Sequence, residues 1–345
     1  MTAPEPTGAV TGSAAERERA VAALTGLAVG DALGMPTQSL PREQIIARYG
    51  RLTRFEPGPP DQPIAPGMPA GSVTDDTEQA VLLGRLLLAG GGRIDGHRLA
   101  RELLAWEDEM RRRGSLDLLG PSTRAAVAAV AAGRPIEEAG RYGTTNGAAM
   151  RITPVGIAVP PDDLDRLVER VVEASWVTHN TGVALAGAAA VAAAVSAAVA
   201  GADVADATAL AVRAARLAGV RGHWVAAADI ADRIAWATGL VAGRSPEAAA
   251  DLIYRLVGTS VATQESVPAA FAVLAVYPDD PWQACLFAAS LGGDCDTIAA
   301  MVGAIAGAAH GAGAFPTAAL GTIRAVNHLP LPEMATNLLA LRQRG

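Results

Sequence analysis

Two acidic segments, far apart along the chain, carry side chains that could do chemistry. Their hydroxyl and carboxyl residues are Thr74, Asp75, Asp76, Asp294, Asp296 and Thr297. Each segment comes directly before an apolar run that is typical of a helix, so each places its oxygens at a helix N-terminus. Taken singly, such residues commonly do no more than cap free backbone N–H groups and offset the helix dipole.

The surroundings of the two segments favour a metal site. Small and apolar residues flank them, and no lysine or arginine stands directly beside the carboxylates. Carboxylates gathered in a poorly hydrated place repel one another unless cations lie between them. Because the ligands are hard oxygens, with no histidine or cysteine cluster at zinc spacing, we expect Mg²⁺, with Mn²⁺ as the substitute. Two ions bridged by a shared carboxylate would hold a sugar diol and lower the pKa of a bound water.

Composition indicates the fold class. Half of the 345 residues are apolar but only 4% are aromatic, so the core must be built from alanine, leucine and valine. Alanine and leucine favour helices, and few stretches alternate as strands do. We predict an all-α protein with a single compact multi-helix domain over residues 16–345, and a disordered tail over residues 1–15.

Helical periodicity and Gly, Pro or Asp punctuation predict the individual elements. They are a helix beginning near Glu16, then helices at roughly 41–49, 75–90, 96–113, 121–132, 147–158, 162–177, 180–200, 204–218, 223–241, 245–258, 265–276, 280–290, 294–311, 316–326 and 331–343. The long stretch 57–71 lacks an apolar period and is typical of a lid or binding loop. Gly303, Gly307 and Gly311 recur every four residues, which lets another helix approach closely.

Charge and hydropathy limit the environments of the protein. The formal net charge of -7, without a lysine- or arginine-rich block, argues against a nucleic-acid or acidic-membrane surface. Residues 182–201 carry no charge over the length of a bilayer span, but they are mainly alanine without basic or aromatic flanks, which favours a buried core helix. Cys285 and Cys295 cannot build a disulfide framework, and the first residues lack the pattern of a secretion signal. We expect a cytoplasmic protein and a monomer.

Four blocks of sequence are characteristic when taken together. They read GLAVGDALGMPTQ at 26–38, SVTDDTEQA at 72–80, TNGAAMRITPVG and WVTHNTGVALAGAA at 145–156 and 176–189, and LGGDCDTIAAMVGAIAGAAHG at 291–311. In this order and over nearly the whole chain, they resemble the ADP-ribosylglycohydrolase family, the group that includes the dinitrogenase-reductase-activating glycohydrolase. The combination of TDDT with GGDxDT makes this resemblance specific.

The resemblance implies an all-helical domain with a binuclear magnesium site in a cleft. The implied metal ligands are the six residues of the acidic segments, with Asp296 as the bridge. The implied substrate-binding residues are Asn146, Gly147, Ala148, Met150, Arg151, His179 and Asp31. The loop that begins at Asn146 would lie against the phosphates of ADP-ribose. Asp31 could instead orient the site through hydrogen bonds, or simply end a helix.

Position 38 departs from the pattern of the family. The family usually has a glutamate there that contacts a metal or its water and acts as acid or base, whereas this chain has Gln38. With Asp76 and Asp296, Gln38 completes the expected catalytic set, but an amide can only ligate or orient and cannot take a proton. Proton transfer would fall to a metal-bound aspartate, to the substrate or to Glu78, whose simpler interpretation is a first-turn helix acid.

Three functions remain open at this point. The first is magnesium-dependent hydrolysis of the glycosidic bond at the anomeric carbon of a ribose in an ADP-ribosyl compound, either linked to protein or free. The second is the same chemistry on a smaller N-ribosyl or nucleoside-like metabolite, because Gln38 and the loop PIAPGMPAG set the chain apart. The third is a non-catalytic binding member of the family that retains the metal scaffold.

Overall fold

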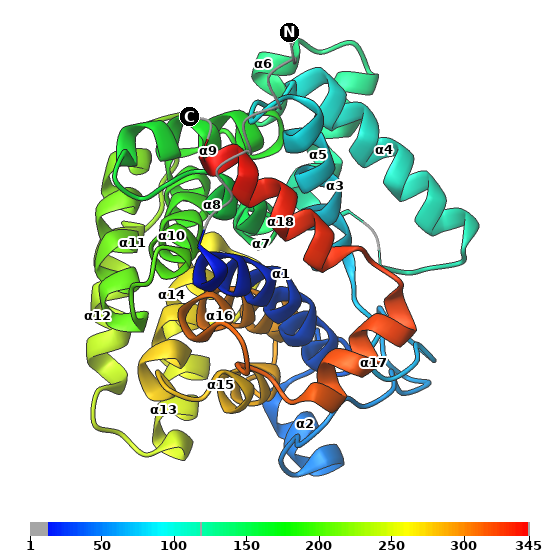
Figure 1. Ribbon diagram of the computed structural model, residues 1–345. Coiled ribbons are helices and arrows are strands. Elements are labelled where there is room, and N and C mark those ends of the chain that lie inside the picture. Colours follow the sequence, from blue (N-terminus) through cyan, green and yellow to red (C-terminus); the bar gives the residue numbers. More distant parts are fainter. Residues whose placement is uncertain (1–12, 118, 344–345) are drawn as a thin grey trace, which may run out of the picture.

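Helices make up the regular structure of the protein in this computed structural model, which describes residues 13–117 and 119–343 (Figure 1). Within these residues, β pairing is limited to two isolated bridges, Thr145 with Ala262 and Thr181 with His223. The all-α prediction is confirmed. In chain order the helices are α1 (Ala14–Gly34), α2 (Arg42–Tyr49), α3 (Asp75–Ala89), α4 (Gly96–Arg112), α5 (Pro121–Ala131), α6 (Ile136–Ala139), α7 (Gly147–Met150), α8 (Thr153–Ala158), α9 (Leu164–His179), α10 (Gly182–Val199), α11 (Val204–Gly219), α12 (Ile230–Val241), α13 (Pro246–Leu252), the π-helix η1 (Ile253–Val257), α14 (Thr263–Val276), α15 (Pro281–Ala289), α16 (Cys295–His310), α17 (Thr317–Asn327) and α18 (Leu331–Arg342).

Several elements differ from the predicted helices. The segment predicted as one helix at 147–158 forms the short helices α7 and α8, because Pro154 lacks an N–H and begins a new helix. The segment predicted at 223–241 becomes helical only at Ile230, where the Asp229 side chain accepts a hydrogen bond from the backbone N–H of Asp232. The four-residue helix α6 was not predicted.

Helix α1 begins two residues earlier than expected. The Ser13 hydroxyl accepts from the backbone N–H of Glu16, and the Glu16 carboxylate accepts from the backbone N–H of Ser13. This capping box fixes the start of the helix at Ala14. Residues 1–12, which hold most of the predicted tail, lie outside the described residues.

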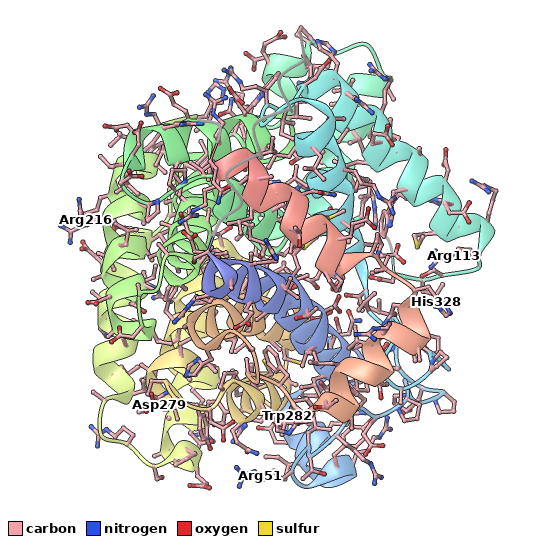
Figure 2. All side chains as sticks on the ribbon, in the orientation of Figure 1. Arg51, Arg113, Arg216, Asp279, Trp282 and His328 are labelled. Carbon is pink, nitrogen blue, oxygen red and sulfur yellow. The ribbon has the colours of Figure 1, made fainter. Side chains whose placement is uncertain are left out.

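Helix α10 forms the centre of the core. Its residues from Val183 to Val199 are all buried, against neighbours that include α8, α9, α11, α14 and α16. Among the described residues it is the one helix long and apolar enough to cross a membrane, and 94% of that span is buried inside the protein. Burial in the core therefore accounts for its composition. Charged side chains such as those of Arg113 and Arg216 lie instead at the periphery (Figure 2).

Helices α1 and α16 touch along their backbones. A methyl group added to Gly26 would lie 2.1 Å from the carbonyl oxygen of Gly303, and one added to Gly30 would lie 1.9 Å from that of Ala299. The predicted close approach of a second helix is thus confirmed, and the partner is the glycine series of α1. Gly311 has another role, because its φ of 67° lies in the left-handed region at the end of α16.

This glycine contact leads directly to the acidic segments. A Cβ on Gly34 would lie 2.2 Å from the Cα of Asp296, so the last turn of α1 rests on the first turn of α16. Helix α3 packs against both helices. The three helices therefore bring Asp31, Asp76 and Asp296 to one place.

We predict that Gly30→Ala destabilises the protein by about 3 kcal/mol, because the added methyl group must push two buried helices apart. Gly239→Ala in α12 is the matched control, since its Cβ would meet nothing within 4 Å. That control should stabilise the protein by about 0.5–1 kcal/mol. Urea unfolding measures both changes. Equal effects of the two substitutions would contradict a tight α1–α16 contact.

Candidate active site

The two acidic segments meet at one pocket. The Thr297 hydroxyl donates to Asp76 Oδ2 at 3.3 Å, and the Thr74 hydroxyl oxygen lies at the same distance from that atom. The pocket has a volume of about 220 Å³, and its wall includes Asp75, Asp294, Asp296 and Thr297. Thr74 and Asp76 are buried just beneath it. The spatial convergence that the sequence hypothesis requires is present in the structure.

Asp31 fixes the first turn of α3 from below. Its carboxylate accepts from the backbone N–H and the hydroxyl of Thr74, at 3.0 and 2.7 Å, and from the same groups of Thr77, at 3.1 and 2.5 Å. Burial raises the pKa of Asp31 to about 6, although the hydrogen bonds from the two threonines oppose this shift. Asp31 is fully buried and absent from the pocket wall. Of the predicted roles, the structure favours orientation of the site over contact with substrate.

Glycines and hydrogen bonds position the second acidic segment. Gly293 has a φ of 70°, and a Cβ on it would lie 2.4 Å from the carbonyl oxygen of Thr259. That same carbonyl accepts from the backbone N–H of Asp294 at 2.7 Å. The Asn146 amide donates to Asp294 Oδ2 at 2.5 Å and to the Ser266 hydroxyl at 3.0 Å. Asn146 therefore holds an acidic side chain in addition to lining the pocket, and neither Thr259 nor Ser266 was predicted.

The carboxyl groups of the acidic segments resist ionisation in the metal-free protein. Burial is the main cause that raises the pKa of Asp75, Asp76, Asp294 and Asp296. The charges of neighbouring aspartates raise the pKa of Asp75, Asp76 and Asp296 further. Hydrogen bonds from Asn146 and Thr297 oppose the shift at Asp294. These groups are therefore ready to exchange protons for a cation.

The donor atoms fit a hard divalent cation. Asp76 Oδ1 and Asp296 Oδ1 are both buried without a hydrogen-bond partner, so two carboxylate oxygens are free to act as ligands. Within residues 13–117 and 119–343, no group of three or more His, Cys, Asp or Glu side chains lies close enough to form a closed metal cage. The segments thus meet without forming a complete coordination sphere.

Some residues of the predicted phosphate loop line the pocket, and others are buried behind it. Asn146, Gly147 and Met150 line the pocket, whereas Ala148 is buried and absent from the wall. Arg151 is also fully buried, and its guanidinium donates to Gln79 Oε1 at 3.0 Å and to the Thr178 hydroxyl at 2.6 Å. Ala148 and Arg151 therefore lie behind the loop in this structure, and their predicted substrate contacts stay predictions.

His179 supports the same loop from beneath. Its Nε2 lies 3.1 Å from the Thr145 hydroxyl, and its Nδ1 lies 2.8 Å from that of Thr178. A Cβ on Gly147 would lie 3.0 Å from the imidazole Cε1, so the ring packs directly under the glycine. Burial and the charge of Arg151 lower the pKa of His179 well below its ordinary value, which keeps the ring neutral. His179 thus supports the loop in this structure, and its predicted contact with substrate stays a prediction.

Gln38 lies in the pocket wall, and Glu78 does not. Gln38 is buried with its amide nitrogen unpartnered. Its backbone carbonyl accepts from the Gln62 amide at 2.8 Å, which ties the 57–71 loop to the site. Ile64 of this loop lines the pocket, as expected for a binding loop. Glu78 accepts from Trp106 Nε1 at 2.6 Å and pairs with Arg113 at 3.3 Å outside the pocket, so it cannot transfer a proton there.

Asp117 is a further wall residue that sequence reasoning missed. Its Oδ2 accepts from the backbone N–H of Asp75 at 2.9 Å, and burial raises its pKa to about 7. The sequence signal for this role is weak, namely an acid among leucines shortly before the proline that begins α5. Only the fold brings it to the pocket.

Comparison with known proteins identifies the family. The model of the family described as ADP-ribosylglycohydrolase matches residues 12–345. The chain belongs to the ADP-ribosylglycohydrolase family. The resemblance recognised in the four sequence blocks is thereby confirmed, and the predicted fold class agrees with it.

Individual proteins show the extent of the similarity. The chain is 37% identical over 331 residues to YegU of Escherichia coli K12, which is described as an uncharacterized protein. This alignment covers 95% of the present chain and 98% of YegU. The chain is 33% identical over 172 residues to the ADP-ribosyl-[dinitrogen reductase] glycohydrolase of Rhodospirillum rubrum, covering 47% and 52% of the two chains. A solved structure described as an ADP-ribosylglycohydrolase-related protein complex aligns with a TM-score of 0.69 at 25% identity, covering 95% and 99%.

We predict that the metal-free protein becomes more stable as the pH falls from about 7.5 to about 5.5. The folded-state pKa of Asp31 is raised from 3.8 to about 6 and that of Asp117 from 3.8 to about 7, so the folded chain holds these protons more tightly than the unfolded chain. Their stabilising contribution is complete below the unfolded pKa and is lost as the pH rises through 6 to 7. The raised pKa values of Asp75, Asp76 and Asp296 add to this trend, and together the aspartates outweigh His179, whose lowered pKa acts in the opposite direction. Thermal unfolding in EDTA measures this trend, and a Tm that falls on acidification over this range would contradict it.

Proposed function

We propose that this protein is a magnesium-dependent hydrolase that cleaves the glycosidic bond at the anomeric carbon of a ribose in an ADP-ribosyl compound. Membership of the family supports hydrolysis of this type. The observation that carries the proposal is the meeting of two acidic segments at one pocket, with buried carboxylate oxygens of Asp76 and Asp296 left without partners.

The acidic segments would hold two Mg²⁺ ions, with Mn²⁺ as the substitute. The ligands would come from Thr74, Asp75, Asp76, Asp294, Asp296 and Thr297. When bound, the ions supply charge that lowers the pKa of water and binds the ribose diol. Asp31 holds Thr74 and Thr77 in position from below, and Asn146 holds Asp294. These supporting contacts keep the ligand oxygens in place.

Other wall residues bind the substrate and move the proton. Gly147 lines the wall at the start of α7, where the backbone can face an anionic group of the substrate, while its missing side chain leaves room for the His179 ring beneath. The unpartnered amide of Gln38 orients a polar group but cannot ionise. Asp117 lies in the same wall and outside the two acidic segments, and its Oδ1 is the atom that we assign to proton exchange with the leaving group or the attacking water.

The size of the pocket supports a second candidate substrate. A volume of about 220 Å³ lies below the range of roughly 300–1,000 Å³ that is usual for larger ligands. Within the described residues, no aromatic side chain lines the pocket to stack on an adenine ring. Both features favour a compact N-ribosyl or nucleoside-like compound over a complete ADP-ribosyl group.

A substrate comparison tests the proposal. The purified protein with Mg²⁺ is incubated with arginine- and serine-linked ADP-ribosyl peptides, with O-acetyl-ADP-ribose and with a panel of nucleosides. Release of ADP-ribose from the first three supports the ADP-ribosyl function, and release of ribose from nucleosides alone supports the compact substrate. Mg²⁺ binding without turnover of any compound would contradict both and leave a non-catalytic binding member of the family.

We predict that Asp296→Asn weakens Mg²⁺ binding and lowers activity by more than about 100-fold each, because it removes a charged ligand from the pocket. Asp206→Asn is the matched control, since Asp206 occupies the first turn of α11 and is exposed. That control should leave both properties unchanged. Calorimetric Mg²⁺ titration and the substrate assay measure the effects. Full activity of wild type after exhaustive chelation would refute the metal requirement.

We predict that Asp117→Asn lowers kcat by about 10²–10⁴-fold while Mg²⁺ binding is largely kept, because the amide oxygen still accepts from Asp75 N but the group no longer carries a proton. Adding Gln38→Glu to this variant should recover part of the rate, since it returns an ionisable carboxyl to the same wall. Steady-state kinetics of the single and double variants measure this. An Asp117→Asn enzyme with the wild-type kcat would remove Asp117 from the proton pathway.

A further inference from the structure

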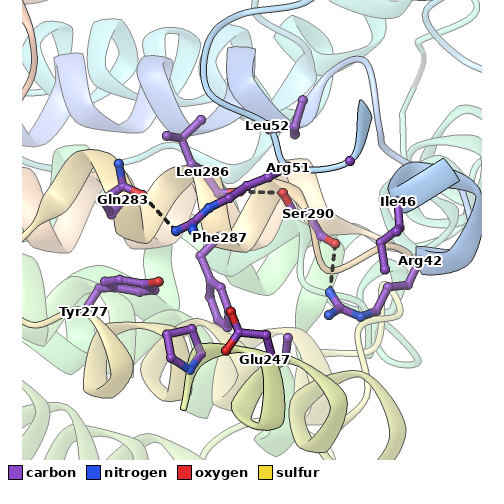
Figure 3. A pocket seen from close by; sticks show the side chains of 13 residues that line it. Arg42, Ile46, Arg51, Leu52, Glu247, Tyr277, Gln283, Leu286, Phe287 and Ser290 are labelled. Atoms are coloured by element: carbon purple, nitrogen blue, oxygen red, sulfur yellow. Dashed lines mark hydrogen bonds between the residues drawn. The ribbon is translucent and has the colours of Figure 1, made fainter. Parts of the chain in front are cut away.

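A second pocket lies between α2, α13 and α15 (Figure 3). Its volume is about 250 Å³, and it shares no lining residue with the acidic pocket. Its wall combines two guanidinium groups, two aromatic rings, an amide and a carboxylate. These belong to Arg42, Arg51, Tyr277, Phe287, Gln283 and Glu247. The proposed hydrolysis uses none of these residues.

The two arginines provide the positive charge of this wall. Arg42 donates to the carbonyl oxygen of Ser290 at 3.2 Å, and its Nε lies 3.7 Å from the largely exposed Asp251. Arg51 donates to Gln283 Oε1 at 3.3 Å and, within the described residues, has no carboxylate at ion-pair distance. Figure 3 shows Arg51 extending toward Gln283 and Arg42 beside Ser290. The Arg51 guanidinium thus retains donors for an anion.

The aromatic rings provide an apolar face beside these charges. Tyr277 and Phe287 contact edge to face, with ring centroids 5.4 Å apart and planes at 61°. Leu52 and Leu286 are buried in the same wall. A planar ring placed there would exchange water for aromatic and aliphatic contacts. The exposed Glu247 carboxylate lies on the same pocket and can accept from hydroxyl or amine groups.

We infer that this second pocket binds a small anion that carries one planar ring system, of the class of the nucleoside monophosphates. The phosphate binds Arg51 and Arg42, whose planar guanidinium groups match its oxygens. The base packs on Tyr277 and Phe287, and the sugar hydroxyls donate to Glu247. The volume of about 250 Å³ has room for one ring system with one anionic group.

The backbone connects this pocket to the acidic one. Ser39, in the wall of the acidic pocket, donates its N–H to the carbonyl of Gly293 at 2.7 Å, and Gly293 donates to that of Leu40 at 3.0 Å. Three residues after Ser39 is Arg42, which bonds the carbonyl of Ser290. The segments 38–42 and 290–294 therefore run together between the two pockets. The acidic pocket lies at residues 38, 39 and 294, and the second pocket lies at residues 42 and 290. A ligand on Arg42 restrains both segments and slows their amide hydrogen exchange.

The binding experiment uses adenosine 5′-monophosphate as the probe in isothermal titration calorimetry. Adenosine and ribose 5-phosphate each lack one of the two recognised groups and should bind at least about tenfold more weakly. Arg51→Gln should weaken binding of the monophosphate by about tenfold or more, because it removes a charged donor from an exposed position without disturbing the core. Arg48→Gln in the last turn of α2, three residues before Arg51, is the matched control, since Arg48 pairs with Asp61 at 2.6 Å outside the pocket.

Two results would overturn the inference. The first is an absence of monophosphate binding to the wild-type protein. The second is binding that Asp296→Asn abolishes and Arg51→Gln leaves intact, which would place the nucleotide in the acidic pocket. Neither result bears on whether the acidic pocket hydrolyses an ADP-ribosyl compound, so the two proposals fail separately.

Hydrogen exchange tests the backbone connection without any substrate. Saturating monophosphate should slow exchange in peptides that cover residues 38–42 and 290–294 of the wild type, and it should have no such effect in Arg51→Gln at the same concentration. Unchanged exchange in the wild type despite measured binding would show that the two pockets are independent.

Discussion

The contact between α1 and α16 is the constraint on which the candidate site depends. Glycines at 26, 30 and 34 lie directly against the backbone of α16, at separations that no side chain could occupy. Because α16 begins beside Asp296 and α1 ends just after Asp31, this contact sets how far apart the acids lie. The alanine-rich core around α10 serves the same end, since small side chains let helices pack closely.

Electrostatic repulsion is the cost of this close packing. The aspartates are buried close together, and burial and their mutual repulsion raise the pKa values of Asp76 and Asp296. These carboxyl groups therefore tend to stay protonated in the folded protein. A layer of buried, hydrogen-bonded polar groups supports them. Neutral His179 lies under the loop, the two terminal nitrogens of Arg151 donate to Gln79 and Thr178, and Asp31 binds the start of α3. A cation relieves the repulsion, so the site is organised for ligand binding more than for stability.

The sequence by itself determined the helical class, most helix positions and the two acidic segments. Helix periodicity and capping are local properties, because they depend on neighbours three or four residues away. The glycine spacing at 303 and 307 correctly indicated a close helix contact, and the uncharged run at 182–201 was correctly interpreted as core. The order of the motifs was sufficient to recognise the family.

Tertiary structure alone decided which of the recognised residues face the pocket. Arg151, His179, Ala148 and Asp31 belong to recognisable motifs, yet all are buried behind the wall, because motif membership does not specify side-chain direction. Asp117 joins the site through a loop that carries little local signal. The pairing of α1 with α16, and the second pocket between α2, α13 and α15, connect segments that lie about 200 residues or more apart in sequence. Such contacts depend on packing of the whole chain, which no local pattern encodes.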